Sequence, residues 1–433
     1  MVAFTKHIAR EWRFMLRQRY VLILLVCAFI LSSFAVFTGV SEVSSQRQTI
    51  ERLKLADETD RLEAQAKYDD PGSLAYYTFH LSYSEPSNLA FAALGERDTY
   101  PWKHRIRMLA LEGQIYESDA QNAELAQAGK IDFTFVIAAL SPLLLILLFH
   151  DLSANERTSG RHDLLVTTAK MKIHLWGARI VVRLLAVFLC LLLPFYVAAF
   201  ISDTAWSSIA LVSLWCFAYF IFWTLISVYV GRKSSSAPRV ASALIAIWVL
   251  FVFILPILGD LAIKQAVHSP KGGDILMVQR EAVNAAWDLP VETTMDAFVA
   301  KHPKYANYKK EHEGFNWGWY YAFQQVGDQT AANLSQAYAD ASQRKYDFAA
   351  YVAMLSPPML LQRKMTRLAN SDAIAAFQYE KEIRSFHAEL REFYYPWLFL
   401  ENDFDKAVLS DLPNFNNNEN QHKKQNKVDT NER

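Results

Sequence analysis

The sequence has 433 residues, of which 52% are hydrophobic, and its 44 basic residues balance 44 acidic ones. Without a basic excess to neutralise phosphates, nucleic-acid binding has no support. The three cysteines all lie in apolar runs, so they give no argument for a disulfide framework or a thiolate metal site. The apolar residues form blocks separated by charged segments, which is typical of a membrane protein with several spans.

Five apolar blocks are long enough to cross a hydrocarbon core, which needs about 20 residues. They predict spans at 21–40, 132–150, 179–201, 208–230 and 240–262. The first block is too long for the apolar core of a signal peptide, and a poor cleavage site follows it. We therefore expect a retained anchor.

Basic residues near the span ends predict the side of the membrane on which each connecting segment lies. They gather in 1–20, in 151–178 and in 231–239, which alternate correctly with five spans. These three segments are therefore expected in the cytoplasm. The same rule places 41–131 and 263–415 outside, followed by a polar tail at 416–433 that we expect to be disordered.

Both long outer segments are polar and have helical patterns. Apolar positions in 42–68 predict a mostly solvated helix that runs out from the first span. Residues 280–350 and 371–395 predict further amphipathic helices, and alternating strand patterns are scarce. The expected fold is an all-α integral membrane protein, with five transmembrane helices and two largely helical extracytoplasmic segments.

Two arginines stand at the start of the third predicted span. Arg179 can extend its side chain to the headgroups, whereas Arg183 lies about one turn deeper. A charge at that depth is costly unless it is paired or faces protein. Arg183 is therefore either a functional intramembrane charge or, more simply, an anchor whose side chain reaches the membrane surface.

The segment between the second and third spans is the most informative. It leaves the second span as a helix, turns at a glycine and resumes with an apolar patch, so a short amphipathic helix parallel to the membrane is expected. In order, its residues resemble the corresponding loop of the membrane subunits of type-2 ABC exporters, and the matching positions are Glu156, Arg157, Gly160, Leu164 and Leu165. The resemblance implies that these residues contact a separate ATP-hydrolysing subunit.

Further stretches after residue 240 resemble a subgroup of these proteins that has large extracytoplasmic domains. The fifth span, the segment at 281–288, Leu355-Ser356-Pro357-Pro358 and Leu412-Pro413-Asn414-Phe415 follow the order of its C-terminal domain of unknown function. Members of that subgroup usually carry a sixth span after the last of these stretches. Here the polar tail follows instead, and this departure puts a standard six-span arrangement in doubt.

Motifs for chemistry are missing. No Gly-x-x-x-x-Gly-Lys-Ser/Thr sequence occurs, so energy for transport would have to come from a partner. No His-Glu-x-x-His, Cys-x-x-Cys or Gly-x-Ser-x-Gly motif is present either, and the outer histidines lack convincing ligand spacing. We therefore expect no enzyme, no catalytic residue, no metal and no cofactor.

The resemblance implies the transmembrane subunit of an ABC transporter in a bacterial inner (plasma) membrane. The implied partners are an ABC ATPase subunit, a second permease copy or paralogue, and the lipid bilayer. The alternative is a membrane-anchored scaffold or sensor whose outer domain binds a partner without transport, and a membrane enzyme is the third possibility. Neither the substrate nor the direction of transport follows from the sequence.

Overall fold

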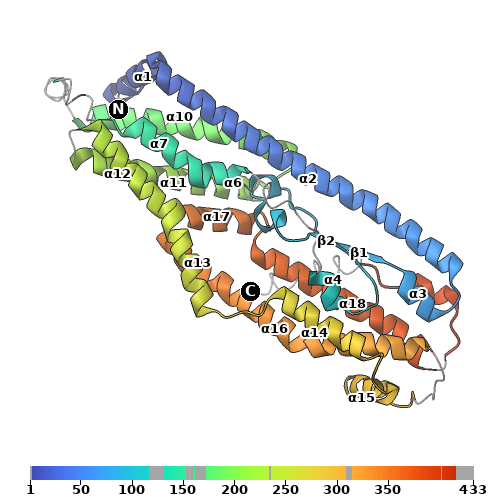
Figure 1. Cartoon of the computed structure of the whole chain (residues 1–433). Coiled ribbons are helices and arrows are strands. Elements are labelled where there is room, and N and C mark those ends of the chain that lie inside the picture. Colours follow the sequence, from blue (N-terminus) through green and yellow to red (C-terminus); the bar gives the residue numbers. More distant parts are fainter. Residues whose placement is uncertain are drawn as a thin grey trace.

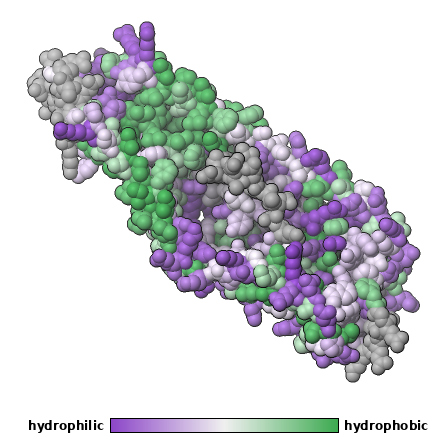
Figure 2. Space-filling view, in the orientation of Figure 1, coloured by the Kyte–Doolittle hydropathy of each residue, from purple (hydrophilic) through white to green (hydrophobic). Residues whose placement is uncertain are grey.

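A computed structural model describes residues 2–116, 131–152, 156, 160, 172–233, 236–308, 315–400 and 402–415. Most of the chain is helical. Figure 1 shows an elongated molecule in which long helices connect two parts, which we call the bundle and the distal domain. The surface of the bundle is largely apolar and that of the distal domain is largely hydrophilic (Figure 2). The apolar helices indicate a membrane protein.

The bundle contains the N-terminal helix and the apolar helices. Its elements are α1 (Val2–Arg17), the first half of α2 (Arg19–Lys67), α6 (Phe133–Phe135), α7 (Ser141–Phe149), α10 (Lys172–Ile201), α11 (Trp206–Lys233) and α12 (Ala237–Val249). Helix α1 is amphipathic and packs across α10 and α2. Large buried side chains such as Phe195, Phe220 and Trp223 fill the core between the helices.

Within the described part of the chain, four helices are long and apolar enough to cross a membrane: α2, α10, α11 and the continuous helix from Ala237 to Ala266. The predicted second span is a shorter apolar helix, Phe133–Phe149. The structure thus establishes four membrane-length helices, and the count of five rests on the sequence. Because an α-helix rises about 1.5 Å per residue, α2 is about 74 Å long and far exceeds a hydrocarbon core of about 30 Å. Its second half extends along the distal domain (Figure 1) and covers the helix expected over 42–68 except for the last residue, since α2 ends at Lys67.

Two apolar helices contain a wide π-helical turn. The turn η3 (Val136–Leu140) precedes α7, and η4 (Leu250–Ile254) separates α12 from α13 (Leu255–Ala266). Each turn ends two residues before a proline, Pro142 or Pro256. Proline has no N–H to donate and its ring clashes with the preceding turn, so a local widening of the helix accommodates it.

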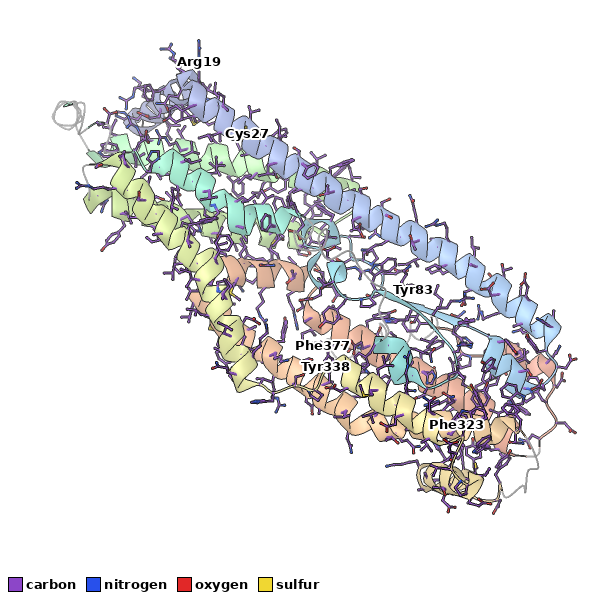
Figure 3. The ribbon with its side chains drawn as sticks, in the orientation of Figure 1. Arg19, Cys27, Tyr83, Phe323, Tyr338 and Phe377 are labelled. Carbon is purple, nitrogen blue, oxygen red and sulfur yellow. The ribbon has the colours of Figure 1, made fainter. Side chains whose placement is uncertain are left out.

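The distal domain is built from the second half of α2 and the C-terminal helices. Its further elements are α3 (Pro71–Tyr77), η2 (Gly95–Asp98), α4 (Leu111–Tyr116), α14 (Gly272–Ala285), α15 (Val291–Lys301), η5 (Pro303–Tyr305), α16 (Trp317–Leu355), α18 (Ala373–Phe399) and η6 (Lys406–Asp411). The aromatic segment at the start of α16 lies in its core, where Tyr321 and Phe323 are buried. Figure 3 places Phe323 and Tyr338 of α16 far from Cys27 of the bundle.

The expectation of an all-α fold was wrong in one place. Strands β1 (His80–Tyr83) and β2 (Lys103–Ile106) pair antiparallel, with His80 opposite Ile106 and Tyr83 opposite Lys103. All residues of β1 are buried. Polar and apolar residues alternate along it, but a run of four residues is too short to indicate a strand from the sequence. The sheet has only these two strands among the described residues.

Two short elements connect the distal domain to the bundle. The 3₁₀ turn η1 (Ala90–Ala92) lies so close to α2 that a Cβ atom on Gly39 would be 2.0 Å from the carbonyl oxygen of Phe91. Helix α17 (Pro357–Leu368) follows α16 but packs on the bundle, where Leu361 and Met365 belong to the apolar core. The C-terminal part of the chain is thereby attached to the apolar helices.

Candidate functional site

A cluster of five charged residues lies where α1 meets α10 and the segment after α7. The Nε atom of Arg179 donates to Glu11 (3.1 Å), and its Nη1 atom donates to Glu156 (3.3 Å). Arg183 forms an ion pair with Asp151 (3.4 Å) and also donates to the carbonyl oxygen of Leu148. We call Glu11, Asp151, Glu156, Arg179 and Arg183 the charge cluster.

The helical repeat explains how the cluster forms. Arg179 and Arg183 are four residues apart, so both guanidinium groups project from one face of α10. Glu11 lies on the buried face of α1, whereas its neighbours Arg10 and Arg13 are exposed to solvent. Asp151 lies two residues after the end of α7, which brings its carboxylate to Arg183. Two separate segments, α1 and the segment after α7, therefore supply the partners of one helix face.

Burial makes these ion pairs significant. The Arg179 and Arg183 side chains are only 10% and 7% exposed. When one partner of such a buried pair is removed, the remaining charge is uncompensated, and the cost is about 3–5 kcal/mol. The cluster therefore connects α1, α10 and the segment after α7.

Two of the five residues predicted to contact an ATPase lie among the described residues. Glu156 belongs to the charge cluster. Gly160 has a φ angle of +68°, a conformation that glycine adopts without steric cost, and the sequence analysis expects a turn at this position. Arg157, Leu164 and Leu165 lie outside the described residues.

Arg183 was expected either as a functional charge or as an anchor that reaches the membrane surface. Its side chain lies inside the bundle, paired with Asp151, so its surroundings fit a paired intramembrane charge. Glu11 and Asp151 were not predicted as partners from the sequence. Glu11 carries a usable signal, because it is the single acidic residue among five Lys and Arg residues in the first twenty positions.

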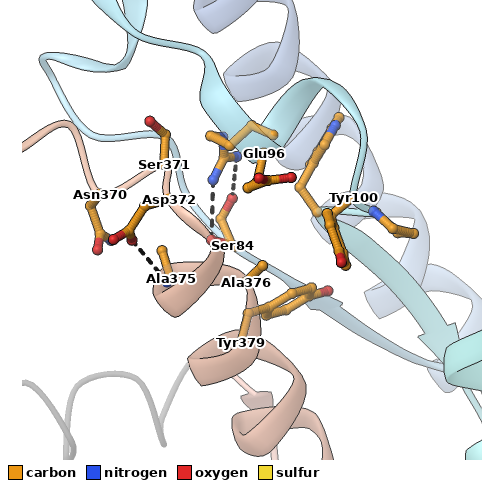
Figure 4. Close-up of a pocket in the computed structure, with 12 residues that line it drawn as sticks. Ser84, Glu96, Tyr100, Asn370, Ser371, Asp372, Ala375, Ala376 and Tyr379 are labelled. Carbon is orange, nitrogen blue, oxygen red and sulfur yellow. Dashed lines mark hydrogen bonds between the residues drawn. The ribbon is translucent and has the colours of Figure 1, made fainter. Parts of the chain in front are cut away.

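A second polar site lies in the distal domain near η2 and is drawn in Figure 4. The Arg97 guanidinium is buried and donates to the carbonyl oxygen of Ser84 (2.6 Å) and to Oε1 of Gln46 (3.1 and 3.0 Å). No carboxylate among the described residues forms an ion pair with it, and burial lowers the pKa of Arg97 to about 10. Neutral oxygens thus hold this cation, which connects η2 to β1 and α2.

Ion pairs in an open cleft of the distal domain hold α4 between α16 and α18. Arg384 donates to both carboxylate oxygens of Glu112 (3.0 and 3.1 Å). Asp328 pairs with Arg391 (2.7 Å) and accepts the backbone N–H of Leu111 (2.8 Å). These charged groups satisfy one another across three helices, so their role is structural.

The buried histidines of the distal domain are core residues. Desolvation lowers the pKa of His80 to about 3 and that of His104 to about 4, and it lowers the pKa of His387 well below its ordinary value. His387 donates from Nε2 to the carbonyl oxygen of Arg107 at 3.0 Å. Among the described residues, no three His, Cys, Asp or Glu side chains are placed to hold a metal ion.

Comparison with known proteins gives one match. Residues 275–418 match the family model "Domain of unknown function (DUF3526)". No curated protein and no solved structure matches the sequence significantly. The matched segment extends from α14 to the end of the described chain, so it includes α16, α17 and α18 but not the charge cluster. It confirms the resemblance of the C-terminal part to a domain of unknown function, while the relation of the whole chain to type-2 ABC exporters stays a prediction.

Proposed function

We propose that this chain is the transmembrane subunit of an ABC transporter of the type-2 exporter class, which forms the translocation path and receives energy from a separate ATPase subunit. The observation that carries the proposal is the ion pair between Glu156 and Arg179. Glu156 belongs to the segment that resembles the ATPase-contacting loop, and Arg179 belongs to a membrane-length helix. The loop is therefore joined to a span by a buried charge pair.

In this proposal the second span is the apolar helix Phe133–Phe149, which completes five spans. The N-terminus lies in the cytoplasm of a bacterium, α1 lies at the inner surface of its plasma membrane, and the distal domain is extracytoplasmic. Closure of the ATPase subunits displaces the segment 151–178. The displacement reaches α10 through Arg179 and Arg183, and reaches α1 through Glu11.

The π-helical turns supply positions at which spans can bend. By the i→i+5 pairing of a π turn, Pro142 removes the N–H that would bond the carbonyl of Ile137, and the hydroxyl of Ser141 donates to that carbonyl instead (2.6 Å). The hydroxyl of Tyr219 donates to the next carbonyl, that of Ala138 (2.6 Å). The indole of Trp248 donates to the adjacent carbonyl of Ala139 (2.8 Å). Side chains from two neighbouring spans thus satisfy a widened turn, and these bonds can be remade when the helix changes its bend.

A second permease copy or a paralogue would complete the path. The helix from Ala237 to Ala266 is the least buried of the four membrane-length helices. Only 11% of its most apolar stretch of 18 residues is buried. Its exposed apolar side chains include Ile245 on α12 and Leu250 on η4. This face supports an interface with another membrane subunit.

Co-purification of the full chain from membranes tests the proposal. The wild-type protein should retain an ATP-binding-cassette ATPase. Mass spectrometry identifies this subunit, and the rate of ATP hydrolysis should change when the complex is reconstituted into lipid. A Glu156→Ala, Leu164→Ala variant should lose most of the ATPase while it inserts normally. Glu58→Ala, an exposed glutamate in the distal half of α2, serves as the control.

Two results would count against the assignment. An intact complex with the double variant would remove the docking role of the loop. A wild-type chain that retains no ATPase would instead favour the alternative, a scaffold or sensor that moves no substrate.

A further inference from the structure

Helix α17 packs against two apolar helices of the bundle. Its Lys364 ammonium group is 5.3 Å from the ring centre of Trp215 on α11. At the other end of α17, Ser356 donates to the carbonyl oxygen of Phe251 in η4 (2.8 Å). Helix α17 therefore crosses α11 and η4 while its apolar face, with Leu361 and Met365, enters the core of the bundle.

The depth of α17 can be estimated from α11. That helix has 28 residues and is about 42 Å long, so it exceeds a hydrocarbon core of about 30 Å by about 12 Å. Trp215 lies about 14 Å from its first residue. If α11 is centred, Trp215 is within about 8 Å of the edge of the hydrocarbon core, a level from which a lysine side chain reaches the headgroups.

The opposite face of α17 is cationic. Between Asp347 and Asp372 the chain has no acidic residue, but it contains Arg363, Lys364 and Arg367. Arg367 pairs with Asp372 (3.3 Å) and Arg363 stacks on the ring of Tyr346 (3.6 Å to its centre). Among the described residues, neither Arg363 nor Lys364 has a carboxylate partner. We call these three side chains the basic face.

Apolar surface borders the basic face on both sides. On α11, Leu211 and Leu214 near Trp215 are exposed. On η4 and α13, the exposed residues include Phe253, Ile257 and Leu261. Figure 2 shows a hollow beside the apolar surface of α12 and α13, with hydrophilic surface on its inner side at the place of α17. The basic face thus lies beside an apolar surface that continues along a membrane-length helix.

We propose that α17 binds an anionic phospholipid, with the phosphate on Arg363, Lys364 and Arg367 and the acyl chains along α11 and the α12–α13 helix. Arginine and lysine donate strong hydrogen bonds to phosphate oxygens, and a tryptophan beside a lysine is typical of the headgroup level. A soluble anion would use only the basic face. A phospholipid would also cover the apolar residues beside it, which explains why both surfaces occur together.

This site requires that the apolar helices cross a membrane but does not require transport. It therefore stands or falls separately from the ATPase assignment. It places the lipid in the membrane leaflet next to the distal domain. Because Ser356 and Tyr346 join α17 to both η4 and α16, an occupied site would also stabilise the contact between the distal domain and the bundle.

Native mass spectrometry of the delipidated full-length protein tests the site, with phosphatidylglycerol and phosphatidylcholine of identical acyl chains as probes. The wild-type protein should prefer phosphatidylglycerol. At about 1 kcal/mol, or about a fivefold loss, per basic residue, Arg363→Gln, Lys364→Gln should lower that preference about 30-fold. The control Lys301→Gln, Lys304→Gln removes two charges at the end of the distal domain far from the bundle, and should leave the preference unchanged (Figure 1).

The single variant Lys364→Gln keeps the stacking of Arg363 on Tyr346, so it remains informative if the double variant folds poorly. Equal binding of both lipids to the wild-type protein, or an unchanged preference in Lys364→Gln, would overturn the proposal. Displacement of the lipid by millimolar glycerol 3-phosphate would show a headgroup site without acyl-chain contacts, and would also contradict it. A dimer in which the second copy covers this face and excludes lipid from it would also overturn the proposal.

Discussion

The hydroxyl group of Ser356 donates a 2.8 Å hydrogen bond to the carbonyl oxygen of Phe251. In a π-helical turn a carbonyl accepts from the N–H five residues later, which for Phe251 is Pro256, a residue without an N–H. Ser356 therefore supplies the donor that the proline removes. It also accepts the N–H of Met359 and so caps α17. One side chain of the family-matched segment thus serves both a bent apolar helix and the start of its neighbour.

Ser356→Ala should destabilise the protein. It leaves the Phe251 carbonyl without its donor and removes the helix cap, losses of about 1–3 kcal/mol and about 1 kcal/mol respectively. Thermal unfolding of the purified chain should show a lower Tm. Ser45→Ala, at an exposed position of α2, should leave the Tm almost unchanged, and an equal effect of the two substitutions would argue against this role of Ser356.

The charge cluster makes a prediction about compensation. Arg179→Ala removes the buried cation that pairs with Glu11 and Glu156 and leaves Arg10 beside Glu11 (3.0 Å), so unfolding free energy should fall by up to about 3–5 kcal/mol. The further substitutions Glu11→Gln and Glu156→Gln remove the two carboxylates that lost this cation and should restore part of the loss. Chemical denaturation in detergent measures both steps. Arg13→Ala, which changes an exposed arginine of α1, should alter stability by less than about 0.5 kcal/mol.

Hydropathy predicted the apolar helices because each span must satisfy its backbone hydrogen bonds within its own helix. This requirement is local, so it can be recognised from the sequence. The spacing of apolar residues predicted the long helix beyond the first span, the position of a charge within a span marked Arg183, and the resemblance to the exporter loop marked Glu156. Glu11 could not be found as the partner of Arg179, because the two residues are 168 positions apart and only packing brings them together. Strand β1 was missed because its four residues are too short a run to stand out in the sequence.

The buried histidines predict a loss of stability in acid. The folded-state pKa values of His80 and His104 are about 3 and about 4, below the ordinary value of 6.5. The unfolded chain therefore binds protons first, so these residues contribute full stability above pH 6.5 and progressively less as the pH falls towards about 4. Each contributes a slope of up to about 1.4 kcal/mol per pH unit in that range.

Denaturation of the full chain at a series of pH values measures this slope. His104→Gln removes one of the titrating groups, so its stability should depend less steeply on pH between 6.5 and 4, whatever its effect at pH 7. Substitution of His268, an exposed histidine residue between α13 and α14, should leave the slope as in the wild-type chain. An unchanged slope in His104→Gln would mean that this histidine is not held neutral in the folded protein.

Two helical glycines give opposite predictions for the same substitution. A Cβ atom on Gly39 would lie 2.0 Å from the carbonyl oxygen of Phe91, whereas one on Gly273 would have no atom within 4 Å. Gly39→Ala forces α2 away from η1 and should destabilise the protein by about 1–3 kcal/mol. Gly273→Ala, in the first turn of α14, should instead raise stability slightly, by up to about 1 kcal/mol. The added Cβ atom is fixed to the backbone of α2 and would contact backbone atoms of Phe91. Rotation of a side chain therefore cannot relieve the contact. Parallel Tm measurements on the two variants should therefore shift in opposite directions, and a neutral Gly39→Ala would show that α2 and η1 are not in close contact.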